Sequence, residues 1–234
     1  MPEAQPTVLW GADHAAVLAL TVVAAWLVVI NRRRLQRAPS RLARRLAASL
    51  LLGNELIGWA VATAQGHIRV PLQLCDLAMV LTVWALWRAQ PAIGEVAYFW
   101  GLGGSLQAIL TPDVRDGFPD YWWIKFFIGH CGVVLSVIYL AAAGELRPTH
   151  RSVWRMWGLT NLYAAVAGLL NAAWGTNYGY LARKPSQPSL LDYFGPWPYY
   201  IVGMELVALA SFYVFYAPWA WSGRRAARQP HRSR

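Results

Sequence analysis

Two side chains in the sequence have the types needed for nucleophilic chemistry. Cys75 and His130 both lie inside long apolar stretches, in different parts of the chain. A cysteine thiolate can attack an ester carbonyl while a nearby histidine takes up and returns the proton. Cys75 is predicted near the start of its helix, where the helix dipole favours a thiolate. The alternative interpretations are that Cys75 is a small buried hydrophobic residue and that His130 only bonds to another helix.

Further polar side chains fall inside the apolar stretches, where they mark functional sites or contacts between helices because lipid offers them no partner. As substrate-binding residues we predict Asn54, Glu55, Asp76, Gln107, Asn171 and Glu205. With the rise of a helix, Gln107, Asn171 and Glu205 lie about 6 to 12 Å below the outer membrane surface, in the same layer as Cys75 and His130. We therefore predict one polar cavity in the outer half of a helical bundle.

The sequence offers no support for a metal ion or a cofactor, and we predict neither. Its His, Cys, Asp and Glu residues lack the spacing of metal ligands. The three glycines at 101, 103 and 104 have no phosphate-loop context, so we interpret them as sites of close helix packing. A Schiff-base photoreceptor would need a buried lysine, whereas Lys125 is expected near a helix end and Lys184 in a loop.

Seven apolar stretches must position these residues. The 234-residue chain is 57% hydrophobic and 14% charged, whereas about a quarter of a soluble domain is charged. Each stretch is close to the roughly 20 residues that cross a bilayer as a helix. We predict one all-α domain, residues 1–234, of seven transmembrane helices. The spans are about 14–31, 46–66, 71–87, 92–111, 122–143, 153–177 and 196–221, followed by a basic tail at 222–234.

Charge sets the predicted orientation. Sixteen Lys and Arg residues fall on one side of the seven spans and five on the other. The richer side is expected in the cytoplasm, with the N-terminus outside and the C-terminus inside. This distribution also accounts for the formal net charge of +10 without a nucleic-acid partner. In the outer loop at 177–195, Ser189 and Asp192 have the spacing of a capping box, which predicts a short interfacial helix.

Several motifs resemble those of the YwaF-like family of bacterial integral membrane proteins. The matching stretches are Pro71-Leu-Gln-Leu-Cys75, residues 99–113, Phe126-Phe-Ile-Gly-His130, Gly175-Thr-Asn-Tyr178 and residues 189–198. This family is related to the eukaryotic transmembrane protein 164 family, whose members are described as lipid acyltransferases that use a cysteine and a histidine. His130 matches the family's histidine. The eukaryotic cysteine directly follows the proline, where this chain has Leu72, and Cys75 lies three positions further on.

The resemblance implies a multi-pass protein of the bacterial inner membrane that acts on membrane lipids, as a phospholipid acyltransferase or a lipid hydrolase. The sequence does not specify the acyl donor, the acceptor or the oligomeric state. Two other functions remain open: a small-solute transporter or receptor-like seven-helix protein, and a non-catalytic lipid-binding protein. Transporters more often show internal repeats and paired broken helices, which are not visible here. The pairing of Cys75 with His130 favours the enzyme.

Overall fold

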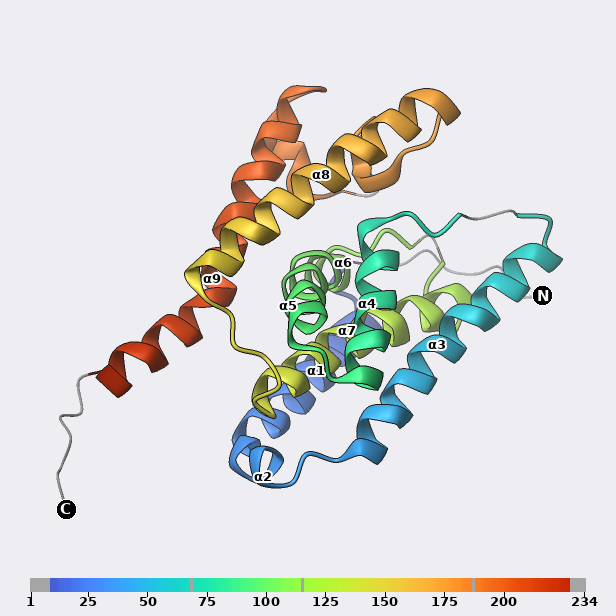
Figure 1. The fold of residues 1–234 in the computed structure, drawn as a ribbon. Coiled ribbons are helices and arrows are strands. Elements are labelled where there is room, and N and C mark those ends of the chain that lie inside the picture. The colour runs from blue at the N-terminus through green and yellow to red at the C-terminus, as the bar shows by residue number, and fades with distance from the viewer. Residues whose placement is uncertain (1–8, 68–69, 115, 187, 228–234) are drawn as a thin grey trace, which may run out of the picture.

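The computed structural model describes residues 9–67, 70–114, 116–186 and 188–227, and over these ranges every regular element is a helix (Figure 1). The longer helices are α1 (Ala12–Ile30), α3 (Arg41–Ala64), α4 (Leu74–Arg88), α7 (Tyr121–Ala142), α8 (His150–Trp174) and α9 (Tyr199–Ala227). The shorter ones are α2 (Arg32–Arg37), α5 (Pro91–Trp100), a π-helix at Gly101–Ser105, α6 (Leu106–Leu110) and 3-10 helices at Tyr178–Tyr180 and Leu190–Phe194. The predicted all-α class is confirmed. Residues 228–234 of the predicted tail lie outside the described residues.

A helix covers most of each of the seven predicted spans, the fourth being divided among α5, the π-helix and α6. By length and composition, four helices are able to cross a membrane: α1, α3, α7 and residues Tyr199–Trp221 of α9. Helix α4 has 15 residues and is therefore only about 22 Å long. The protein is thus a helical membrane protein.

The start of α4 and the end of α8 differ from the predicted boundaries. Pro71 was expected in the first turn of the third span, but the helix begins only at Leu74. The reason is a capping interaction, in which the backbone N–H of Gln73 donates to the Asp76 carboxylate at 3.0 Å. At the other boundary, Gly175 adopts a left-handed conformation with φ of 67°, which ends α8 shortly after Trp174.

Figure 1 shows α8 and α9 side by side, apart from the cluster formed by α1, α3, α4, α5 and α7. The clustered helices share a buried core that includes Phe99 and Val137. His14 is completely buried at the start of α1. Its Nε2 donates to the Ile109 carbonyl at 2.8 Å, and its Nδ1 accepts from the backbone N–H of Trp10 at 3.1 Å. The start of α1 is therefore fixed to the end of α6.

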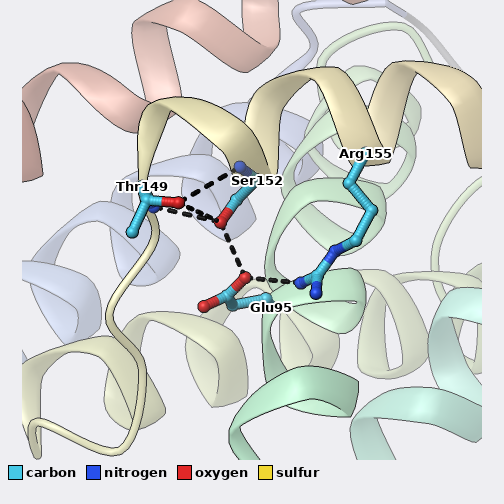
Figure 2. A network of polar contacts seen from close by, with 4 residues as sticks. All are labelled: Glu95, Thr149, Ser152 and Arg155. Carbon is cyan, nitrogen blue, oxygen red and sulfur yellow. Dashed lines mark hydrogen bonds and ion pairs between the residues drawn. The ribbon is translucent and has the colours of Figure 1, made fainter.

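Helix α8 joins the cluster through a polar network at its first turn (Figure 2). Thr149 and Ser152 form a capping box, and the Ser152 hydroxyl donates to Glu95 of α5 at 2.9 Å. Arg155 pairs with the same carboxylate oxygen at 2.6 Å. These contacts hold the starts of α5 and α8 together. Further along α5, the Tyr98 hydroxyl donates to the Phe215 carbonyl of α9 at 2.9 Å.

The π-helix lies where the glycine-rich stretch was expected to allow close packing. A Cβ atom on Gly101 would be 2.9 Å from Cγ1 of Val133 in α7, which is too close for any residue larger than glycine.

In the 177–195 loop, the backbone N–H of Ser189 donates to Asp192 at 2.8 Å. A short 3-10 helix at Leu190–Phe194 begins directly after this capping box. The helix predicted from the spacing of Ser189 and Asp192 is therefore present as a short 3-10 helix.

Candidate functional site

A cavity of about 650 Å³ separates the helix cluster from the α8–α9 pair. Residues of α3, α4, α5, the π-helix, α6 and α7 line one side, and α8, α9 and both 3-10 helices line the other. Most of the lining is apolar or aromatic, with a limited number of polar side chains. Of the eight predicted site residues, six line the cavity: Glu55, Cys75, Asp76, Gln107, His130 and Glu205.

Cys75 is the second residue of α4 and is partly buried. Its sulfur lies against the π-helix, because a Cβ atom on Gly104 would be 3.2 Å from Cys75 Sγ. The neighbouring Asp76 caps the same turn by accepting from the backbone N–H of Gln73, which fixes the first turn of α4. The thiol therefore has a defined position between the first turn of α4 and the π-helix.

His130 has a defined tautomer. Its Nδ1 is 3.0 Å from the Phe126 carbonyl one turn earlier in α7, and the two rings stack at 4.2 Å. A carbonyl oxygen only accepts, so Nδ1 carries a proton, and when the ring is neutral its lone pair is on Nε2. A neutral imidazole with its lone pair on Nε2 has the form that a general base requires. The neighbouring Cys131 is absent from the cavity lining.

Two polar contacts bring charge to the cavity from different helices. Lys125 of α7 pairs with Glu55 of α3 at 2.7 Å, and both side chains are largely buried. On the opposite side, Glu205 of α9 accepts a hydrogen bond from Asn161 Nδ2 at 3.0 Å. Asn54 is not part of the lining, because its amide donates to the Lys125 backbone carbonyl at 3.2 Å and joins α3 to α7.

Asn171 was expected at the depth of the cavity, but it lies outside the lining. Its Oδ1 accepts from the Tyr178 N–H at 2.7 Å and from the Thr176 hydroxyl at 2.8 Å. Its Nδ2 donates to the Tyr178 carbonyl at 3.0 Å. The side chain is thereby fully engaged in shaping the chain that leaves α8.

Gln73, Asp113 and Tyr163 are among the polar lining residues that sequence reasoning missed. Tyr163 donates to the Leu72 carbonyl at 3.0 Å, and Gln73 Oε1 accepts from the Gly179 N–H at 2.8 Å. Asp113 accepts from the hydroxyls of Tyr180 and Ser186 at 3.0 and 2.9 Å. A tyrosine inside a span resembles ordinary apolar packing in a sequence. The Asp113 carboxylate, by contrast, follows a span and was a recognisable signal.

Within the part of the chain that the structure describes, no group of three or more His, Cys, Asp or Glu side chains could hold a metal ion. The cavity lining supplies a thiol, an imidazole, carboxyl groups and amides. These groups are suited to attack on a carbonyl and to proton transfer. The largely apolar lining suits a substrate that carries a hydrocarbon chain.

One of the comparisons with known proteins identifies a family. The TMEM164 family model matches residues 9–216. An uncharacterized protein of Treponema pallidum (strain Nichols) is 28% identical over 186 residues, which are 76% of this chain and 76% of the relative. No solved structure gives a significant match.

Proposed function

This chain belongs to the TMEM164 family, and we propose that it transfers acyl chains between membrane lipids with Cys75 as nucleophile and His130 as general base. The observation that carries the proposal is that both side chains line one largely apolar cavity. The cavity volume of about 650 Å³ lies in the range of small-molecule sites. An acyl chain fits the apolar part, and the ester group fits the polar part.

The proposed reaction has two half-reactions. His130 Nε2 takes the thiol proton, and the Cys75 thiolate adds to the ester carbonyl of a phospholipid. The tetrahedral intermediate expels the lysolipid alkoxide, which receives the proton from His130, and a thioester remains on Cys75. The hydroxyl of an acceptor lysolipid then gives its proton to His130 and attacks the thioester, and the thiolate leaves and regains the proton. Attack by water instead would make the protein a lipid hydrolase.

The amide and carboxyl groups in the lining have proposed roles in binding. Gln107 is a hydrogen-bond donor for the oxyanion that forms in both half-reactions. Glu55, Asp76 and Glu205 contact the polar part of the lipid. Glu205 is supported by its position on α9, across the cavity from α4 and α7. Asn54 and Asn171 act indirectly in this proposal, since each holds backbone that borders the cavity.

The test is transient S-acylation of purified protein in detergent with phospholipid labelled in its acyl chain. Wild type should retain label that hydroxylamine releases, and Cys75→Ser should retain none. Cys131→Ser is the matched control, because this second thiol lies outside the cavity lining and should leave labelling unchanged. His130→Ala should slow labelling by orders of magnitude, as removal of a catalytic base does.

Full labelling of Cys75→Ser would refute the assigned nucleophile. A wild type that binds lipid without ever becoming labelled would favour a non-catalytic lipid-binding protein. Uptake of a water-soluble solute into proteoliposomes, lost in cavity variants, would instead favour a transporter. The three functions therefore give different results with one set of variants.

We also propose seven membrane crossings in the bacterial inner membrane, with the N-terminus outside. Support comes from contacts between helix ends that this topology assigns to the same side. His14 bonds to Ile109 at the predicted outer side, and Arg44 pairs with Glu145 at the predicted cytoplasmic side at 2.9 Å. In a chain without native cysteines, an impermeant maleimide added to intact cells should label Arg183→Cys and spare Ser40→Cys. The reverse pattern would overturn the orientation.

A further inference from the structure

An arginine-rich surface lies where α1 ends and α3 begins. Helix α2 and the first turns of α3 present six exposed arginine side chains: Arg32, Arg33, Arg34, Arg37, Arg41 and Arg45. Among the described residues, none of these side chains forms an ion pair or a hydrogen bond. We call these six residues the arginine surface. Its charge is uncompensated, so it attracts anionic groups.

The nearby carboxylates do not neutralise this surface, because they are already paired. Glu145, three residues beyond the end of α7, binds Arg44, whose side chain is mostly buried. Glu95 at the start of α5 binds Arg155 and the Ser152 hydroxyl. No acidic residue occurs between Arg32 and Arg45 in the sequence. The exposed guanidinium groups therefore lack an internal counter-charge.

The surface is held in place by the fold. Gln36 Nε2 donates to the Ala142 carbonyl at 3.1 Å, and the Arg44–Glu145 pair ties the first turn of α3 to the same end of α7. The Ser40 hydroxyl caps α3 by accepting from the Ala43 N–H at 3.1 Å. The two anchored helices keep the backbone positions of the arginines constant, and each guanidinium group can bind a phosphate through two parallel hydrogen bonds.

Exposed apolar side chains border the arginine surface on both neighbouring helices. On α1 the side chains of Val29 and Ile30 are about half exposed, and on α3 Leu42 and Leu46 are more than half exposed. In a membrane protein these side chains face acyl chains. The arginines directly beyond them therefore lie at the depth of the lipid head groups, where clustered Lys and Arg residues bind anionic lipids.

We propose that the arginine surface is a binding site for anionic phospholipid head groups of the surrounding bilayer. This site is separate from the cavity, and it lies on the face of the fold that the acyl-transfer proposal does not use. Its function is to select the lipids that surround α1 and α3. Binding is electrostatic, with bidentate contacts to phosphate, and it is weakened by salt.

The test is native mass spectrometry of the full chain, released from mild detergent after incubation with equal amounts of phosphatidylglycerol and phosphatidylcholine. Wild type should retain phosphatidylglycerol preferentially. Near an anionic membrane surface each arginine contributes a factor of about 5 in binding. The triple variant Arg33→Gln, Arg37→Gln, Arg41→Gln should therefore lose the preference by on the order of 100-fold.

The matched control removes the same charge from other exposed positions, with Arg88→Gln, Arg147→Gln and Arg151→Gln. This control should keep the preference. An equal loss in both triple variants would overturn the site, because net charge alone would then explain binding. A wild type without any preference would overturn it as well. Arg→Lys replacements at the three test positions keep the charge, so they should restore part of the preference if the altered protein is folded.

Discussion

Gly104→Ala is the most direct test of the position assigned to the Cys75 thiol. The new Cβ atom would lie 3.2 Å from Cys75 Sγ, which is tighter than ordinary van der Waals contact. The sulfur or the helix backbone must therefore move by a few tenths of an ångström. A misplacement of 1 Å costs about 100-fold in rate, so a shift of this size should slow acylation of Cys75 roughly 3- to 10-fold.

The neighbouring glycine supplies a matched control for this prediction. A Cβ atom on Gly103 would lie 3.6 Å from Phe212 Cε1, which is ordinary contact. Gly103→Ala introduces the same methyl group into the same π-helix and gains the same helix propensity, so differences between the two variants report on the thiol.

Two rates should be measured for each variant: labelling by an acyl-labelled phospholipid and alkylation of Cys75 by a small maleimide. We expect both rates to fall in Gly104→Ala and to stay near wild type in Gly103→Ala. Equal rates in both variants, or a larger effect in Gly103→Ala, would refute the inferred contact between the thiol and the π-helix.

Three further substitutions test contacts that hold the fold. Lys125→Met leaves the Glu55 carboxylate largely buried without its partner, so it should destabilise the fold by about 3 to 5 kcal/mol. Glu55→Gln in the same chain should recover part of this loss in a thermal unfolding assay. Asn171→Ala removes three hydrogen bonds from the chain leaving α8 and should lower the free energy of unfolding by about 1 to 3 kcal/mol. The alkylation rate of Cys75 should remain within a few-fold of wild type. Loss of Cys75 alkylation with unchanged stability would contradict the structural role of Asn171. His14→Leu leaves the Ile109 carbonyl without its donor and should lower the melting temperature by several degrees, and an unchanged melting temperature would show that this bond contributes little.

The sequence was sufficient to predict the helices because their cause is local. A run of about 20 apolar residues forms a helix in lipid whatever its neighbours are. Helix α2 and the π-helix were not predicted. Helix α2 is polar, and its Gln36 bonds to the end of α7. In the π-helix, Gly101 packs closely against Val133 of α7. Both are tertiary contacts, which the apolar pattern does not show.

The sequence led to a prediction for the depth of the candidate residues, but it could not predict the direction of their side chains. Residue counting placed Gln107 and Asn171 at similar depths, yet only Gln107 lines the cavity. Depth follows from the number of residues after the helix end, whereas the direction of a side chain depends on how the helix is rotated against its neighbours. Asn171 lies four residues before the C-cap glycine of α8 and bonds to the chain beyond it. The path of the chain after α8 could not be predicted from the pattern of apolar residues.

The π-helix at Gly101–Ser105 also changes the helical phase between α5 and α6. A π-helical turn accommodates an extra residue relative to an α-helix, so the residues after it are turned relative to those before it. Removal of one residue from this stretch would rotate α6 by about 100°. Gln107 would leave the cavity and the Ile109 carbonyl would turn away from His14. The number of residues between Trp100 and Gln107 therefore matters for the position of the Gln107 side chain. We expect the protein to tolerate deletion of one residue less well here than in the loop at 111–120.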